Sequence, residues 1–160
     1  MLQDKSILIT GGSSMVATHM KEILPSGYNV MYIDSSYCDL TDSKAVKWLI
    51  SSIMPDHIIH LAAKVGGIQD NIKYPAEYFN ENILMNTILI KVCQEYNIKR
   101  FTGILSTCIY PDVVDTYPMS ELDIHKGPPA PTNFSYGYSK RAMAVQIDAH
   151  NKQYGTKYNY

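Results

Sequence analysis

Along this 160-residue chain, short runs of near-continuous apolar residues alternate with longer segments in which apolar residues recur every three or four positions. The first pattern is typical of strands buried on both faces of a parallel sheet, and the second of amphipathic helices. Strands that alternate with helices predict an α/β fold, a Rossmann-type doubly wound parallel sheet. The predicted strands are residues 6–10, 28–33, 57–63 and 101–106.

Helices are predicted at 14–24, 43–54 and 76–96, and a last one from about 135 to 154. The apolar stripe of the third comprises Met85, Ile88, Leu89, Val92, Cys93 and Tyr96. The chain finishes with TKYNY, which looks like the start of another strand. We therefore expect one dinucleotide-binding domain over residues 1–160 that stops short of its last strands and leaves an unpaired sheet edge.

Two segments, 63–75 and 111–134, lack a periodic pattern and are rich in Gly, Pro, Asn and Asp. The second is long for a connection without structure, and such loops are often functional. It also follows the carboxyl end of a strand, where open α/β sheets bind their ligands. We expect both segments to be irregular.

Composition narrows the class of protein. Hydrophobic residues make up 46% and charged residues 18%, as in ordinary soluble domains. A net charge of −1, with both signs interspersed, argues against nucleic-acid binding. The N-terminus has only a short apolar run, which predicts neither a signal peptide nor a membrane span. Three cysteines without metal-like spacing predict reduced thiols, no metal site and a cytoplasmic location.

A glycine pair, Gly11 and Gly12, separates the first strand from the first helix. Backbone N–H groups in such a turn, with a helix N-terminus behind them, can hold a pyrophosphate. Ser14 and Ala17 stand where this fingerprint usually has its second and third glycines, and a Gly-Gly turn by itself is a common connection. The residues predicted to contact the cofactor here are Gly11, Gly12, Ser13, Ser14, Met15 and Val16.

Asp34 closes the second strand, 23 residues after Gly11, where an acid meets the adenosine ribose. A carboxylate there favours NAD(H), because it repels a 2′-phosphate; alternatively, Asp34 only begins a turn. Asp39 is predicted to contact the adenine or to cap the following helix. The rest of the predicted cofactor pocket comprises Leu40, Leu61, Ala62, Ala63, Lys64, Tyr136 and Lys140, with Val65 and Gly66 beside the nicotinamide.

Tyr136 and Lys140 are four residues apart and share one face of the predicted last helix. A phenol has a pKa of about 10, and a neighbouring ammonium lowers it, so that the tyrosine can act as a general acid or base. Ser106, at the end of the fourth strand, can hydrogen-bond the same carbonyl oxygen. In a chain with 13 tyrosines the Tyr/Lys spacing also arises by chance.

The motifs TGGSSMV, DLTD, HLAAKVGG, NIKYP, LSTCIYP, HKGPP and NFSYGYSKR resemble, in this order, those of the GDP-L-fucose synthases. These epimerase/reductases belong to the extended short-chain dehydrogenases/reductases. The resemblance implies that Ser106, Tyr136 and Lys140 form a reductase triad and that Cys108 is the base of the C3 and C5 epimerisations. It implies that Ser106, Thr107 and Cys108 bind substrate. A lone cysteine at a strand end is otherwise best read as a small buried residue.

The resemblance also implies NADP(H), GDP-4-keto-6-deoxy-D-mannose as substrate, and a homodimer formed by the third and last helices. Asp34 keeps NAD(H) as an alternative. Members of the family are about twice this length and carry a substrate domain and a histidine acid in their second half. No histidine here matches that acid, although His125 lies in the long loop.

Two other functions remain open from the sequence. One is a dinucleotide-binding module without full catalysis, and the other is a different nucleotide-sugar epimerase or dehydratase. Asn82 and Asn86 either support the site through hydrogen bonds or lie exposed on their helix.

Overall fold

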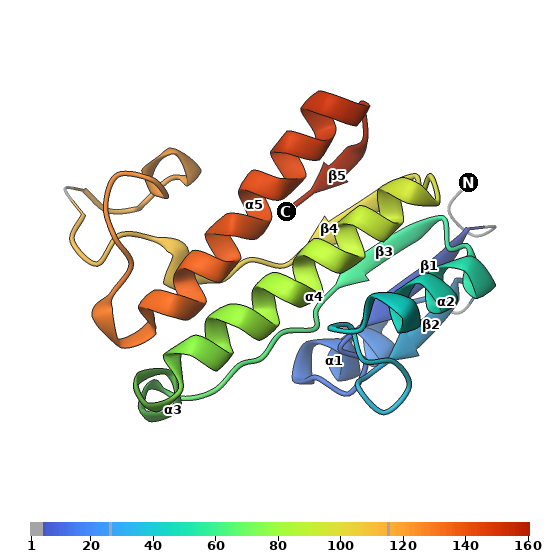
Figure 1. Cartoon of the computed structure of the whole chain (residues 1–160), viewed down its shortest axis with the longest axis horizontal. Coiled ribbons are helices and arrows are strands. Elements are labelled where there is room, and N and C mark those ends of the chain that lie inside the picture. The colour runs from blue at the N-terminus through green and yellow to red at the C-terminus, as the bar shows by residue number, and fades with distance from the viewer. Residues whose placement is uncertain (1–4, 26, 115) are drawn as a thin grey trace.

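A five-stranded parallel sheet forms the centre of the computed structural model, which describes residues 5–25, 27–114 and 116–160 (Figure 1). The strands lie in the order β2-β1-β3-β4-β5, and each neighbouring pair is parallel. The predicted Rossmann-type sheet is therefore confirmed. The strands are β1 (Ser6–Thr10), β2 (Asn29–Ile33), β3 (His57–His60), β4 (Arg100–Gly103) and β5 (Lys157–Asn159).

The order of the strands reverses at β1. The chain passes from β1 outward to β2 and then returns to β3 on the other side, so that Ile9 pairs with both Tyr32 and Ile59. Such a reversal opens a crevice at the carboxyl ends of the strands, where open α/β sheets bind ligands. The loops that follow β1, β2 and β3 meet at this edge.

Three helices lie side by side, α2 (Ser43–Ile53) against α4 (Pro75–Glu95) and α4 against α5 (Phe134–Tyr154) (Figure 1). Because crossovers between parallel strands are right-handed, these three cover one face of the sheet and α1 (Met15–Ile23) lies on the other. The short elements are helix α3 (Ile68–Lys73) and the 3₁₀ turns η2 (Thr107–Ile109), η3 (Glu121–Asp123) and η4 (Pro131–Asn133).

The hydrophobic core lies between the sheet and the layer of α2, α4 and α5. Leu8, Ile58 and Phe101 from the central strands are fully buried in one cluster with Leu89 of α4 and Ile147 of α5. Side chains of this size contribute about 1.5–3 kcal/mol each when fully buried. The cluster therefore fixes α4 and α5 against the sheet.

The third strand is shorter than predicted. It ends at His60 rather than at residue 63. The Ala62 N–H donates to the Thr10 side-chain oxygen, at 3.2 Å, and not to a main-chain carbonyl of a neighbouring strand. The main-chain hydrogen bonds of β3 therefore end before Ala62, because the Thr10 side chain accepts the hydrogen bond that a neighbouring strand would otherwise accept.

The fourth strand also ends early, at Gly103 instead of residue 106. The chain turns into η2, where Ser106 Oγ accepts a hydrogen bond from the Cys108 N–H at 3.2 Å. The run of apolar residues continues past Gly103, and the Ile104 N–H still donates to the His60 carbonyl at 3.2 Å before the backbone leaves the sheet.

The remaining predicted elements are confirmed with ends shifted by one or two residues. The strand suspected in TKYNY is β5, which forms one edge of the sheet. Ser14 is not the first residue of α1 but its N-cap, and its side chain accepts from the Ala17 N–H.

Helix α3 corrects the expectation that 63–75 is irregular. Its Asn71 side chain donates hydrogen bonds to the carbonyls of Gly66 and Gly67, at 3.2 and 3.0 Å, and so fixes the approach to the helix. The segment 111–134 is mostly irregular, as expected, but it contains η3 and η4. No helix among the described residues is long and apolar enough to cross a membrane.

Candidate active site

A cavity of about 800 Å³ opens at the carboxyl edge of β1, β2 and β3. It lies where the strand order reverses, and its size suits a dinucleotide more than a single small ring. The structure brings together here ten residues of the predicted cofactor pocket: Gly11, Ser13, Ser14, Asp34, Asp39, Leu40, Leu61, Ala62, Ala63 and Lys64. Val65 lines the cavity as well, whereas Gly66, predicted beside it, lines only a smaller cavity.

The two glycines of the loop have different roles. Gly11 has φ of +69°, and a Cβ atom there would lie 2.8 Å from the Ala62 nitrogen, so no other residue fits without strain. Gly12 is absent from the cavity lining: its N–H donates to the Ile33 carbonyl at 2.6 Å and joins β1 to β2. Its carbonyl accepts from Lys21 Nζ at 2.8 Å.

Met15 and Val16 also lie outside this cavity. They begin α1, with 84% and 48% of their surface exposed, and line a separate apolar hollow of about 720 Å³ with Ile23. Ser14 remains in the cavity and caps the helix. The helix N-terminus thus keeps a side-chain cap at the position where the fingerprint has a glycine.

Asp34 lines the cavity as a carboxylate. It accepts hydrogen bonds from the Ser36 N–H (3.0 Å) and hydroxyl (2.6 Å), and these bonds, with a weaker one from Ser13, lower its pKa. The two interpretations of Asp34, as a turn residue and as a ribose ligand, are therefore compatible, because both hydrogen bonds from Ser36 go to Oδ1.

Asp39 lines the same end of the cavity. Its carboxylate accepts from the Thr41 hydroxyl (2.7 Å) and N–H (2.8 Å), which lower its pKa. The alternative that Asp39 caps the following helix is wrong, because the N-cap of α2 is Asp42, which accepts from the Lys44 N–H.

Lys64 meets two carboxylates of α4. Its ammonium donates to Glu81 at 2.7 Å and to Glu77 at 2.9 Å, and these bonds raise its pKa above the usual range. Asn82 also holds the Lys64 main chain, accepting from its N–H at 2.9 Å and donating to its carbonyl at 3.0 Å. The positive charge of Lys64 is therefore already neutralised at the edge of the cavity.

A buried chain of polar groups supports the loop after β3. The Nδ1 atom of His60 lies 2.7 Å from Thr10 Oγ1, and Nε2 lies 3.0 Å from Asn86 Oδ1. Burial, aided by the charge of Lys140, lowers the pKa of His60 to about 3, so the ring is neutral. Asn86 and Asn82 are each only 1% exposed, so the alternative that they lie exposed is wrong.

The four predicted catalytic residues come from η2 and α5. Ser106 hydrogen-bonds the Tyr136 side chain, and Lys140, only 2% exposed, donates to the main-chain carbonyl of Ile104 at 2.8 Å. Burial lowers the pKa of Lys140 to about 8.

The pKa of Tyr136 corrects the expectation from its spacing to Lys140. Burial raises this pKa above its ordinary value, and only the hydrogen bond with Ser106 lowers it. The Lys140 ammonium faces the Ile104 carbonyl, so it does not offset the burial of the phenol. Tyr136 is thus a neutral, protonated group in this structure, suited to proton donation.

Cys108 and Tyr136 line a second cavity of about 220 Å³, which also includes Val65. Because Val65 lines both cavities, they adjoin. Gly137 allows the close approach of α5 to η2, since a Cβ there would lie 2.6 Å from the Cys108 carbonyl oxygen. Thr107 is exposed and does not line this cavity.

Arg141 is a structural residue that the sequence analysis missed. It is buried, and its Nε atom donates to the Ile109 carbonyl at 2.5 Å, which ties η2 to α5. Arg141 directly follows Lys140 in the YSKR motif, and this position beside a predicted catalytic residue could have marked it as part of the site.

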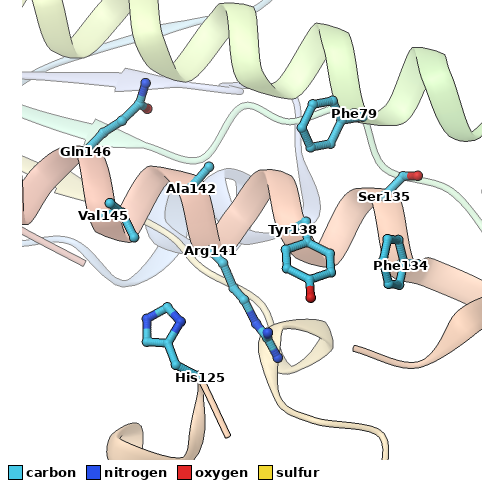
Figure 2. A pocket seen from close by; sticks show the side chains of 9 residues that line it. All are labelled: Phe79, His125, Phe134, Ser135, Tyr138, Arg141, Ala142, Val145 and Gln146. Atoms are coloured by element: carbon cyan, nitrogen blue, oxygen red, sulfur yellow. The ribbon is translucent and has the colours of Figure 1, made fainter. Parts of the chain in front are cut away.

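His125 lies away from the cavity with Cys108. Figure 2 shows it at an apolar pocket of about 700 Å³, together with Arg141 and other side chains of α5. Phe79 of α4 lines the same pocket, so the pocket lies on the paired α4 and α5 surface. The structure gives no support to substrate contact by His125.

Comparison with known proteins identifies the family of this chain. Residues 7–160 match the NAD dependent epimerase/dehydratase family. A GDP-L-fucose synthase of Dictyostelium discoideum is 41% identical over 96% of this chain and 49% of its own length. A probable GDP-L-fucose synthase of Drosophila melanogaster is 34% identical over the same shares.

A solved structure shows the same fold. The GDP-L-fucose synthetase of Naegleria fowleri bound to NADP has a TM-score of 0.87 and 28% identity, covering 99% of this chain and 49% of that one. The chain thus spans about half the length of the curated relatives it matches.

Proposed function

Because the chain belongs to the NAD dependent epimerase/dehydratase family, we propose that it is the dinucleotide-binding half of a nucleotide-sugar epimerase/reductase. The proposed reaction converts GDP-4-keto-6-deoxy-D-mannose to GDP-L-fucose. The observation that carries this proposal is the cavity that contains both Cys108 and Tyr136 and adjoins the larger cavity at the sheet edge. This shared cavity supports the assignment of Cys108 as a base for epimerisation and Tyr136 as an acid for ketone reduction of one substrate.

The larger cavity fits a dinucleotide. The N-terminus of α1 and the Gly11 turn would hold the pyrophosphate, and the carboxylates of Asp34 and Asp39 would face the adenosine. NADP(H) is the cofactor that the relatives favour, and Asp34 keeps NAD(H) as the alternative. When bound, the nicotinamide supplies the hydride for reduction of the ketone.

Epimerisation is assigned to Cys108. Its thiolate removes a proton from the carbon next to the ketone, and the electron pair passes into the C–C bond as the carbonyl oxygen becomes an enolate oxygen. Return of a proton to the opposite face of the carbon completes the inversion, once at C3 and once at C5.

Reduction is assigned to Tyr136, Ser106 and Lys140. The neutral Tyr136 phenol donates its proton to the ketone oxygen as the hydride reaches C4. The Ser106 hydroxyl, already hydrogen-bonded to Tyr136, orients that oxygen. Lys140 is assigned a positioning role, because its ammonium is held by the Ile104 carbonyl and not by the phenol.

A direct test measures NADPH consumption and GDP-L-fucose formation by the purified protein. We expect Tyr136→Phe to lower kcat by about 10²- to 10⁴-fold and to retain deuterium exchange from solvent at C3 and C5. Cys108→Ser should lose that exchange. Cofactor binding without exchange or turnover in the unchanged protein would instead favour a binding module without full catalysis.

We also infer that the protein is a homodimer through α4 and α5, in the cytoplasm. The apolar pocket of Figure 2, with exposed Phe79, Phe134 and Val145, supports a contact surface there. The free thiols Cys38, Cys93 and Cys108 support a reducing compartment. Light scattering with Val145→Glu, against unchanged protein, tests the dimer: we expect the mass to halve.

A further inference from the structure

We propose that the Glu81 carboxylate binds the ribose hydroxyl groups in the nicotinamide half of a dinucleotide bound in the large cavity. The inference rests on the function proposed above, which places a dinucleotide there. Glu81 lines this cavity from α4 and is not one of the cofactor-binding residues predicted from the sequence. It adds a second carboxylate that meets a ribose, besides Asp34.

Glu81 lies at the end of the cavity nearest the proposed chemistry. Its carboxylate meets the ammonium of Lys64, and the residue after Lys64, Val65, lines both the large cavity and the small cavity with Cys108 and Tyr136. The nicotinamide has to reach a substrate in the small cavity, so the nicotinamide half belongs at this end. The adenosine half then lies toward the residues that follow β2, because β1 separates β2 from β3.

One oxygen of Glu81 is available to a ligand. Oε1 accepts a hydrogen bond from the Lys64 ammonium at 2.7 Å. Oε2 makes no hydrogen bond with the described residues, yet it is not one of the unpaired atoms that are closed to water, and the Glu81 side chain is 43% exposed. A carboxylate oxygen can accept two hydrogen bonds, which suits two neighbouring hydroxyl groups of a ribose.

The charges at this end favour hydroxyl groups over phosphate. The single ammonium of Lys64 meets two carboxylates, Glu77 at 2.9 Å and Glu81 at 2.7 Å. One carboxylate is enough to neutralise the ammonium, so one negative charge remains. That charge repels phosphate oxygens and attracts neutral donors. The pyrophosphate is thus left to the turn at Gly11 and the N-terminus of α1.

The carboxylate is held in place before a ligand arrives. Asn82 fixes the main chain of Lys64 through hydrogen bonds with its N–H and its carbonyl, at 2.9 and 3.0 Å, and the Lys64 ammonium in turn holds Glu81. Met85, one turn further along α4, shares the helix face of Glu81 and also lines the cavity. Its apolar side chain suits the carbon atoms of a ribose.

The test is isothermal titration of the purified protein with NADPH, ADP-ribose and ADP. ADP-ribose keeps the second ribose but lacks the nicotinamide, and ADP lacks both. We expect Glu81→Ala to bind NADPH and ADP-ribose about 10-fold more weakly and ADP with unchanged affinity.

Glu77→Ala is the matched control. It removes the other carboxylate of Lys64, on the same helix but outside the cavity lining, and should change none of the three affinities. Both variants should unfold in urea close to the midpoint of the unchanged protein, because each loses one partly exposed ion pair. An equal loss of NADPH affinity in Glu77→Ala would overturn the inference, because the effect would then pass through Lys64.

Equal affinity of Glu81→Ala and the unchanged protein for NADPH would also overturn the inference, while turnover by the unchanged protein would leave the proposed function intact. A parallel loss of ADP affinity would place the contact in the adenosine half, and a loss confined to NADPH would place it on the nicotinamide ring; either result contradicts the ribose assignment. If the unchanged protein binds ADP-ribose no more tightly than ADP, the inference fails. If it binds no probe and shows no turnover, the proposed function fails first and takes this inference with it.

Discussion

The ammonium of Lys140, on α5, donates a hydrogen bond to the main-chain carbonyl of Ile104, just beyond β4, at 2.8 Å. This bond joins the last helix to the backbone that leaves β4. It also holds a positive charge in a site from which water is almost excluded, since Lys140 is 2% exposed. Two pH-dependent properties can be predicted from such buried groups.

Stability should rise with pH where Lys140 loses its proton. Its pKa falls from 10.5 to about 8 on folding, so between these values the unfolded chain binds more protons than the folded one, and stability increases with pH. Urea unfolding of unchanged protein and Lys140→Met between pH 7.5 and 10.5 measures the effect. The slope should be weaker in the variant; equal slopes would show that Lys140 is not the group responsible.

His60 should contribute to acid unfolding. Burial lowers its pKa from 6.5 to about 3, so the unfolded chain binds the extra proton between these values and stability is lost as the pH falls through them. We expect His60→Gln to show a shallower loss of stability from pH 6.5 to 4, measured by urea unfolding. An equal loss of stability in His60→Gln and in the unchanged protein would show that another group is responsible.

Gly11→Ala should impair both folding and cofactor binding. The added methyl group would sit 2.8 Å from the Ala62 nitrogen at a φ of +69°, and strain of this kind costs about 1–3 kcal/mol. Thermal unfolding and NADPH titration measure the two effects. Gly67→Ala is the matched control, because φ there is −70° and a Cβ atom meets nothing within 4 Å.

Asp34→Ser should change the choice of cofactor. The Asp34 carboxylate is ionised at neutral pH and would repel a 2′-phosphate while it accepts from a ribose hydroxyl. Removing it should raise the ratio of NADPH to NADH affinity about 10-fold, as measured by quenching of fluorescence. An unchanged ratio would mean that Asp34 serves its turn with Ser36 and does not meet the ribose.

The fold was predictable because its signals are local and strong. The runs SILIT and HIIHLAA are apolar enough to require burial, and they became β1 and β3. Their ends were harder to predict, since β3 stops where Thr10, 50 positions away from His60, supplies a side-chain hydrogen bond. No window of sequence around His60 contains that contact.

Helix α3 could not be predicted for a related reason. It has six residues, too few for an apolar period, and the hydrogen bonds of Asn71 to two glycine carbonyls hold its start. From the sequence alone, Asn71 is interpreted as an ordinary loop residue. Only the folded structure shows that it lines the cavity with Cys108 and Tyr136.

The sequence predicted ten of the residues that line the large cavity, but not the electrostatics of the candidate site. The spacing of Tyr136 and Lys140 places them on one helix face, which the structure confirms through α5. The pKa values of the two residues depend on how deeply each side chain is buried, and the spacing along the sequence does not determine burial. Burial raises the pKa of Tyr136 and lowers the pKa of Lys140. Only the packing of α5 against β4 and η2 reveals this.

Val65 forms part of the wall of both cavities. Whatever occupies one cavity therefore touches a side chain that the occupant of the other cavity also touches. Where the two occupants shift Val65, binding in the two cavities is thermodynamically coupled, and coupling is reciprocal: the factor by which one occupant changes the affinity for the other is the same in both directions.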